Sequence, residues 1–313
     1  MEQEMEYIYR IYQCKSFSKA AAELYMTQPA LSLAVRRVEE AIGAKLFDRN
    51  SRSLTLTEAG ELYIRKYHEI RNLEKELHQQ LQDLSSLQTG TLHIGGTNFF
   101  NSYILPPVIV SFMEKYPGIE LKMSEAGSYD LLQMLQENRI DLTFNCGLTF
   151  KDPYLRTPCF EDMILLCVPK SFDLPESVMS QTMNNEDILA GSHRSGTFSP
   201  VPLSEFENYP FILLSEGNNL YERTQTMLAR EKCNVTVRLK LTQLATAWHL
   251  SSSGLGITFI SDRLVTDAST SVRFFLIDSP LAVRKFDLVM SERRYVSYAM
   301  KAFEKEFTGY YMK

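Results

Sequence analysis

Hydrophobic residues near the start of the chain recur at helical spacing. Met5, Ile8 and Ile11 predict a first helix. A run of alanines at 20–22 predicts a second helix, with Ser18 as its N-cap. Small residues at these positions allow a neighbouring helix to approach closely, so the first segment is expected to be a compact helical unit.

A third helix is predicted after a short turn. Thr27 is placed to cap it, Pro29 is tolerated in its first turn and Gly43 is placed to end it. The core-facing positions are Ala30, Ala34 or Leu31, Val35 and Val38. The other side chains are of the types that read base edges or contact phosphate, namely Gln28, Ser32, Arg36 and Arg37. Two helices joined this tightly are typical of a helix-turn-helix.

Apolar and polar residues then alternate over 46–57 around an Asn-Ser-Arg turn, which predicts a small β-hairpin. Arg49 and Arg52 lie at its tip, where they suit the phosphate backbone or the minor groove. Taken singly, the arginines of this region fit a solvated surface better. Their order together with the helix-turn-helix favours DNA.

A long helix is predicted from Glu58 to about Leu87, with Thr57 as its cap and no internal proline. Its apolar residues form a narrow stripe at intervals of mostly three and four: Leu62, Ile70, Leu73, Leu77, Leu81, Leu84 and Leu87. Pairing with a second copy would bury this stripe, so we expect a dimer. Packing of the helix on its own domain is the alternative.

The rest of the chain alternates strands with helices, which predicts α/β architecture with a mostly parallel sheet. A strongly apolar segment at 160–168 is expected to cross into a second lobe, and the segments 274–277 and 286–290 are expected to return. Two lobes joined by two crossings form a cleft. The loops after Ile94, Met123, Phe144 and Leu214 are expected to line it, because ligands bind at the carboxyl ends of such strands.

Composition changes this picture little. The formal net charge of −5 argues against DNA only if charge is uniform, and the N-terminal stretch is locally basic. No secretory signal or membrane span is indicated, which favours the cytoplasm. The five cysteines lack metal-ligand spacing and the histidines are scattered, so neither a metal nor a cofactor is expected. No nucleophile motif, phosphate loop or dinucleotide fingerprint is present, so we do not expect an enzyme.

The N-terminal motifs together resemble the DNA-binding domain of LysR-type transcription regulators. The matching residues, in the order and spacing of that family, are 16–21 (SFSKAA), 28–32 (QPALS), 37–39 (RVE), Gly43, 46–47 (LF), Arg49 and 56–60 (LTEAG). Leu33 departs from the pattern, since many members have a polar residue there. The C-terminal part is similar to the effector domain of the same family, which itself resembles periplasmic binding proteins.

This resemblance implies a multidomain α+β fold. It comprises a winged helix-turn-helix over 1–57, a linker and dimerisation helix over 58–89, and a two-lobed effector domain over 90–313. We place the first lobe at about 90–160 and 266–313, and the second at about 161–265.

The resemblance also assigns roles to residues. Gln28, Pro29, Ser32 and Arg36 would face the major groove, and Arg49 and Arg52 would lie on the wing. Arg37 and Lys45 are expected to contact phosphate on the basis of their charge alone, and Thr27, at the start of the same helix, is also expected to contact DNA. Thr97, Asn98, Phe99 and Ser128 occupy positions where the family holds its effector, although simple helix capping explains them equally well.

The partners expected are therefore double-stranded DNA with a roughly palindromic operator and a small-molecule effector, for which a carboxylate is a candidate. A second copy of the chain, in a dimer or a tetramer, is also expected, and RNA polymerase is a further candidate. A solute-binding or sensor protein, in which the cleft alone is active, is the alternative function.

Overall fold

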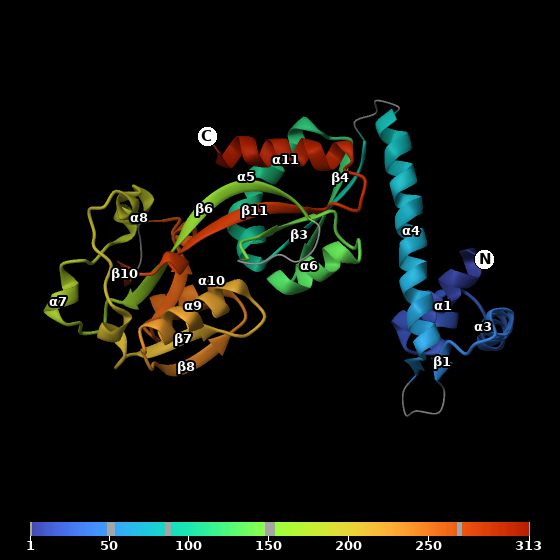
Figure 1. The fold of residues 1–313 in the computed structure, drawn as a ribbon, viewed down its shortest axis with the longest axis horizontal. Coiled ribbons are helices and arrows are strands. Elements are labelled where there is room, and N and C mark those ends of the chain that lie inside the picture. The colour runs from blue at the N-terminus through green and yellow to red at the C-terminus, as the bar shows by residue number, and fades with distance from the viewer. Residues whose placement is uncertain (1, 49–53, 85–88, 148–153, 268–270, 313) are drawn as a thin grey trace. The chain divides into compact units, whose positions relative to one another are not determined.

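The computed structural model describes residues 2–48, 54–84, 89–147, 154–267 and 271–312. The chain divides into two compact units, Met1–Leu81 and Gln82–Lys313. Figure 1 labels the elements of both units, and each unit is described by itself.

The first unit is a winged helix-turn-helix. It contains α1 (Glu2–Cys14), α2 (Phe17–Glu23), α3 (Gln28–Ile42), the antiparallel pair β1 (Phe47–Asp48) and β2 (Thr55–Leu56), and most of α4 (Glu58–Leu84). The N-cap expected at Ser18 is wrong. Ser16 caps α2 instead, and its side chain accepts a hydrogen bond from the Lys19 amide, so the helix begins two residues earlier than the alanine run indicates.

Helix α3 is capped as the sequence predicts. The Thr27 hydroxyl accepts from the Ala30 amide, and Gly43 ends the helix in the left-handed conformation at φ 71°. Its buried face differs from the expectation at one point. Leu31 is fully buried, whereas Ala30 is exposed, because the core of this unit lies one residue further round the helix.

Helix α4 starts in close contact with the wing. The Thr57 hydroxyl accepts from the Gly60 amide, and a Cβ added at Gly60 would lie 2.1 Å from the Leu46 carbonyl oxygen. Gly60 is therefore required for the close packing of α4 against this segment. Further along, the predicted stripe is solvent-exposed: Leu62 50%, Ile70 39%, Leu73 66%, Leu77 55% and Leu81 56%. The side chain of Leu84 and all of Leu87 lie outside the described part.

The second unit contains a seven-stranded sheet in the order β10-β6-β11-β5-β3-β4, with β9 also paired to β6. Its strands are β3 (Gly90–Gly96), β4 (Ile119–Glu125), β5 (Leu142–Asn145), β6 (Tyr154–Pro169), β9 (Thr258–Ser261), β10 (Val272–Leu276) and β11 (Val283–Ser291). Strands β3, β4 and β5 are parallel to one another. The expectation of a mostly parallel sheet is wrong, because the crossing strands β6 and β11 run antiparallel to each other, β11 also to β5, and β6 also to β9 and β10.

Lobe I is built on β3, β4 and β5. Its helical segments are η1 (Phe100–Ile104), α5 (Leu105–Lys115), α6 (Ser128–Gln136) and α11 (Tyr298–Tyr311). Helices α5 and α11 contact each other, while α6 packs through a separate apolar cluster with Ile140 and Val289. The parallel strands therefore present their carboxyl ends, and the loops that follow them, toward lobe II.

Lobe II contains β9, β10 and a second sheet in which β7 (Pro210–Leu214) and β8 (Thr236–Leu241) are parallel. Its helices are α7 (Glu176–Met179), α8 (Asn185–Leu189), η2 (Ser192–Arg194), η3 (Leu203–Phe206), α9 (Asn219–Arg230), α10 (Leu244–Ser252) and η4 (Asp262–Leu264), with η5 (Pro280–Ala282) before β11. Residues 164–169 of β6 pair with β9 and β10 in this lobe.

The expectation that 274–277 returns to lobe I is wrong, because β10 pairs with the lobe II half of β6. The return crossing is β11, which Figure 1 shows beside β6 between the two lobes. Both segments are short apolar runs, and such runs do not reveal which partner strand they will find.

Candidate DNA-reading helix and inter-lobe cavity

Three polar side chains follow one another along α3 at four-residue spacing. Gln28 and Arg36 are exposed and Ser32 is half-buried, so they share one face of the helix near its N-terminus. The Gln28 side-chain amide donates to the Ser32 hydroxyl at 2.9 Å, which fixes the two side chains before any ligand arrives. Thr27 and Pro29 lie beside them at the start of the helix, and both are exposed.

The remaining basic residues of this unit behave differently. Arg37 is exposed on α3, next to Arg36. The Lys45 ammonium is 2.9 Å from the buried carboxylate of Glu39, which also accepts from the Leu46 amide, so this lysine helps to join α3 to the wing. Arg49 and Arg52 lie outside the described residues.

Sequence reasoning missed Tyr25, which lies in the turn between α2 and α3. Its side chain is 98% exposed and its φ is 55°, a left-handed conformation that non-glycine residues seldom adopt. A residue this exposed, in the turn that precedes α3, is available for contact with a partner. No periodic pattern could have indicated it, because its exposure follows from the turn geometry.

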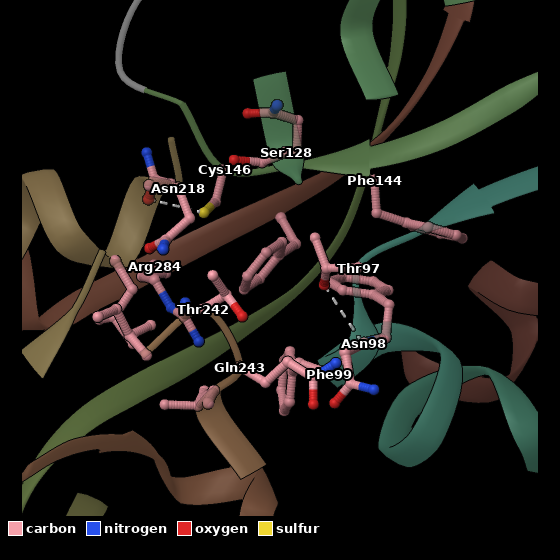
Figure 2. Close-up of a pocket in the computed structure, with 17 residues that line it drawn as sticks. Thr97, Asn98, Phe99, Ser128, Phe144, Cys146, Asn218, Thr242, Gln243 and Arg284 are labelled. Carbon is pink, nitrogen blue, oxygen red and sulfur yellow. Dashed lines mark hydrogen bonds between the residues drawn. The ribbon is translucent and has the colours of Figure 1, made fainter. Parts of the chain in front are cut away.

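A cavity of about 90 Å³ lies between lobes I and II, and we call it the inter-lobe cavity. All four residues expected at the effector site line it: Thr97, Asn98, Phe99 and Ser128. Lobe II contributes residues after β7 and β8, namely Leu214, Asn218, Asn219, Leu220, Thr242, Gln243 and Leu244. Figure 2 shows side chains from both lobes converging on this space.

Two helices of the cavity wall begin without a side-chain cap. Helix α6 starts after Gly127, and α10 starts after Gln243 with no side-chain hydrogen bond at its N-cap. Their first-turn amides therefore lack side-chain acceptors at the cavity, and aligned peptide dipoles favour negative charge there. In addition, the Ser128 hydroxyl is buried with no hydrogen-bond partner among the described residues. These groups suit a small ligand that accepts hydrogen bonds.

The other expected residues already have partners. The Thr97 hydroxyl accepts from the Phe100 amide at 3.4 Å, as a helix cap does, and the Asn98 amide donates to Glu125. Phe99 packs against Phe100 with its ring edge-on. Capping and cavity lining therefore coincide at these positions, and neither excludes the other.

Arg284 is the charged residue of the cavity wall that the sequence did not reveal. It lies on β11, opposite Asp162 of β6, and donates to both carboxylate oxygens of that residue. Burial alone would lower the pKa of Arg284, but the adjacent Asp162 raises it above its ordinary value. Its charge is therefore already balanced. The cavity wall can provide an anion with hydrogen-bond donors but with little net positive charge.

The cysteines do not form a redox pair in this structure. All five are free, and burial raises the pKa of the Cys159 and Cys167 thiols to about 12. Thiolates, the reactive form, are therefore scarce at neutral pH. Cys146 lines the cavity, and burial raises its pKa to about 11.

Trp248 and His193 have structural roles in lobe II. Trp248 is buried and stacks on Phe274 at 5.7 Å between ring centroids, away from the cavity wall. His193 is 2.9 Å from the Asp262 carboxylate in lobe II. Within the described residues, no group of three or more His, Cys, Asp or Glu side chains could hold a metal ion. The described helices include none long and apolar enough to cross a membrane.

Two family models match the chain. Residues 3–61 match the bacterial regulatory helix-turn-helix protein model of the lysR family, and residues 85–309 match the LysR substrate binding domain. The helix-turn-helix match covers α1 to the start of α4, and the second match contains the whole wall of the inter-lobe cavity.

Individual proteins agree with these models. The uncharacterised HTH-type transcriptional regulator YcgK of Bacillus subtilis is 30% identical over 304 residues, covering 96% of this chain and 91% of that protein. Full-length CbnR in complex with its target DNA has the same fold at a TM-score of 0.68 and 12% identity, covering 98% of each chain. The CcmR regulatory domain of Synechocystis PCC6803, in complex with 2-PG, covers 71% of this chain and 98% of its own at a TM-score of 0.59 and 18% identity.

Proposed function

Because this chain belongs to the LysR family of transcription regulators, we propose that it reads a specific DNA site through α3 and that a small effector in the inter-lobe cavity controls this binding. One observation carries the proposal. The same chain contains a helix-turn-helix whose α3 exposes Gln28 and Arg36, and a cavity lined by both lobes of its second unit. The regulator would act on chromosomal DNA in the cytoplasm.

We assign base readout to Gln28, Pro29, Ser32 and Arg36. A glutamine can offer a donor and an acceptor together to adenine, and an arginine can donate two hydrogen bonds to guanine. Thr27 and Arg37 are assigned to the phosphate backbone beside them, and Arg49 and Arg52 to the wing contact. The exposure of Gln28 and Arg36 and the Gln28–Ser32 hydrogen bond support this division.

We propose a small anion with one carboxylate as the effector. The uncapped starts of α6 and α10 and the unpartnered Ser128 hydroxyl would hydrogen-bond its oxygens, and Thr97, Asn98 and Phe99 would hold its remainder. Because Asp162 balances the charge of Arg284, a single negative charge fits better than two. The 2-PG bound to the CcmR domain is a precedent for a ligand in this fold.

We propose a dimer paired through α4, either alone or within a tetramer. The exposed stripe Leu62, Ile70, Leu73, Leu77 and Leu81 supports this assembly, since a second copy would bury it. A two-fold dimer presents two α3 helices, which predicts an operator with inverted half-sites. RNA polymerase is a further partner in this proposal.

Effector control can be tested by measuring the DNA bend angle with fluorophores at the two ends of a bound fragment. We expect a matching monocarboxylate to change the bend in the wild-type protein, because lobe closure changes the arrangement of the DNA-binding units. Ser128→Ala should weaken this response, while DNA affinity without effector stays the same. A bend that no compound in a broad carboxylate panel alters would contradict effector control.

A further inference from the structure

Arg223 lies directly behind the wall of the inter-lobe cavity. It is on α9 of lobe II, and its residue surface is only 5% exposed. Its Nε donates to the Asn219 Oδ1 at 2.7 Å, and its Nη2 donates to the Cys146 carbonyl oxygen at 2.8 Å. Its Nη1 donates to the Leu281 carbonyl at 3.0 Å and to the Val283 carbonyl at 3.4 Å.

These acceptors belong to three different parts of the second unit. Asn219 is on the same helix, Cys146 directly follows β5 of lobe I, and Leu281 and Val283 are at the entry to the β11 crossing. One buried side chain therefore joins lobe II to lobe I and to the crossing strand. Both Asn219 and Cys146 also line the cavity, and the Cys146 thiol donates to the Asn219 Oδ1 at 3.1 Å (Figure 2).

Arg223 differs from Arg284, another buried arginine near the cavity, in the chemistry of its hydrogen-bond acceptors. Arg284 is ion-paired with Asp162, whereas the four acceptors that Arg223 reaches within the described residues are all neutral. Burial lowers the pKa of Arg223, which reflects the unfavourable loss of water around its guanidinium. Because separation of the lobes would return water to this charge, the closed arrangement is only weakly favoured at this point.

A second contact between the lobes lies at the rim. The Tyr129 hydroxyl on α6 donates a hydrogen bond to Glu222 on α9, and partial burial together with this contact raises the pKa of Tyr129. Both residues are exposed, so water competes for the same groups and the pair contributes little to closure. Arg223 lines a second cavity of about 380 Å³ with these two residues, but only 5% of its surface is exposed, so water reaches its contact with the Cys146 carbonyl less easily than it reaches the rim pair.

We propose that Arg223 is a latch that holds the two lobes together through the Cys146 carbonyl, and that a cavity ligand controls the latch through Asn219 and Cys146. Arg223 is a positioning residue in this scheme, since it reaches the ligand only through its neighbours. The inference rests on the proposed function for its regulatory meaning, but the latch itself is a property of the ligand-free protein.

Amide hydrogen exchange of the full-length protein measures the latch directly. The amides of Ser128 and Leu244 are in the uncapped first turns of α6 and α10 and line the cavity, so lobe closure protects them from water. We expect Arg223→Met to accelerate their exchange about tenfold, the effect of losing one hydrogen bond to a charged group. The amide of Leu131, which donates to the Gly127 carbonyl within α6, should be unchanged.

The matched control is Arg230→Met, which removes an exposed arginine from the same helix. It should leave both cavity amides as in the wild type. Equal exchange in Arg223→Met and Arg230→Met, with both proteins folded by circular dichroism, would overturn the latch.

A second variant keeps the positive charge and does not depend on Arg223→Met folding. Arg223→Lys lacks the planar fork that reaches Asn219, Leu281 and Cys146 together, so it should also accelerate exchange of the cavity amides. Unchanged or slower exchange would contradict the proposal. Fluorescence anisotropy with sheared host DNA distinguishes failure of the proposed function from failure of the latch. A protein that binds no DNA but shows both exchange effects would refute the proposed function and still support the latch.

Discussion

At the scale of single residues, the proposed recognition of a specific DNA site depends on Gln28. Replacement of Gln28 by Ala should cost about 1–3 kcal/mol of affinity for the specific site and leave random DNA unaffected, because the side chain reads a base edge. Arg37→Ala should weaken both kinds of DNA alike and lower the salt slope by about 1, since it neutralises a phosphate. Salt titrations on specific and random duplexes measure both effects, and equal losses for the two variants would contradict the division of roles.

Gly60 gives a residue-scale prediction about stability. A Cβ at this position would lie 2.1 Å from the Leu46 carbonyl oxygen, so Gly60→Ala should destabilise the winged unit by about 1–3 kcal/mol through overpacking. Gly309→Ala is the matched control, because Gly309 is in α11 with nothing within 4 Å of its added Cβ and should gain up to about 1 kcal/mol. Denaturant unfolding compares the two, and a stable Gly60→Ala protein would show that α4 can move away from the wing.

At the scale of elements, the exposed stripe of α4 predicts how two copies pair. Leu73→Glu should raise the dimer dissociation constant at least about tenfold, because it places a carboxylate in the apolar contact. Asn72→Glu makes the adjacent charge change away from the stripe and should have little effect. Sedimentation equilibrium distinguishes the two variants. A dimer that Leu73→Glu leaves intact would mean that the stripe packs elsewhere.

The sequence predicted elements better than their partners. The helix-turn-helix, the hairpin and the long helix follow from local caps and periodicity, as the Thr27 cap and the Gly43 stop illustrate. Ala30 and Leu31 are neighbours on α3, and only packing against the other helices decides which one is buried. The β10 segment was placed in the wrong lobe because strand pairing is a long-range property.

The candidate sites show the same limit. Thr97, Asn98, Phe99 and Ser128 follow strands, so the rule for carboxyl ends of strands places them near one another. Arg284 lines the cavity from a crossing strand and Arg223 lies behind the cavity wall on a lobe II helix, and no local pattern distinguishes them from surface arginines. Their importance follows from burial, which depends on the closed fold.

At the scale of the whole molecule, the two proposed functions, DNA reading and effector binding, are assigned to separate units that one helix connects. The first unit ends at Leu81 and the second begins at Gln82, so α4 runs through the boundary between them. Helix α4 is therefore the covalent connection between the lobes and α3. The assembled, DNA-bound protein is therefore the form in which to test whether α3 reads a specific DNA sequence.

Genome-wide footprint sequencing of the tagged protein in its native host tests that claim most directly, with a Gln28→Ala, Arg36→Ala double variant as the comparison. The account predicts discrete peaks that share an inverted-repeat motif and disappear in the variant, while the variant stays folded and expressed at the same level. An absence of enrichment for the folded wild-type protein, or identical peaks for both, would contradict DNA reading by α3 and leave the inter-lobe cavity as the active part of the molecule.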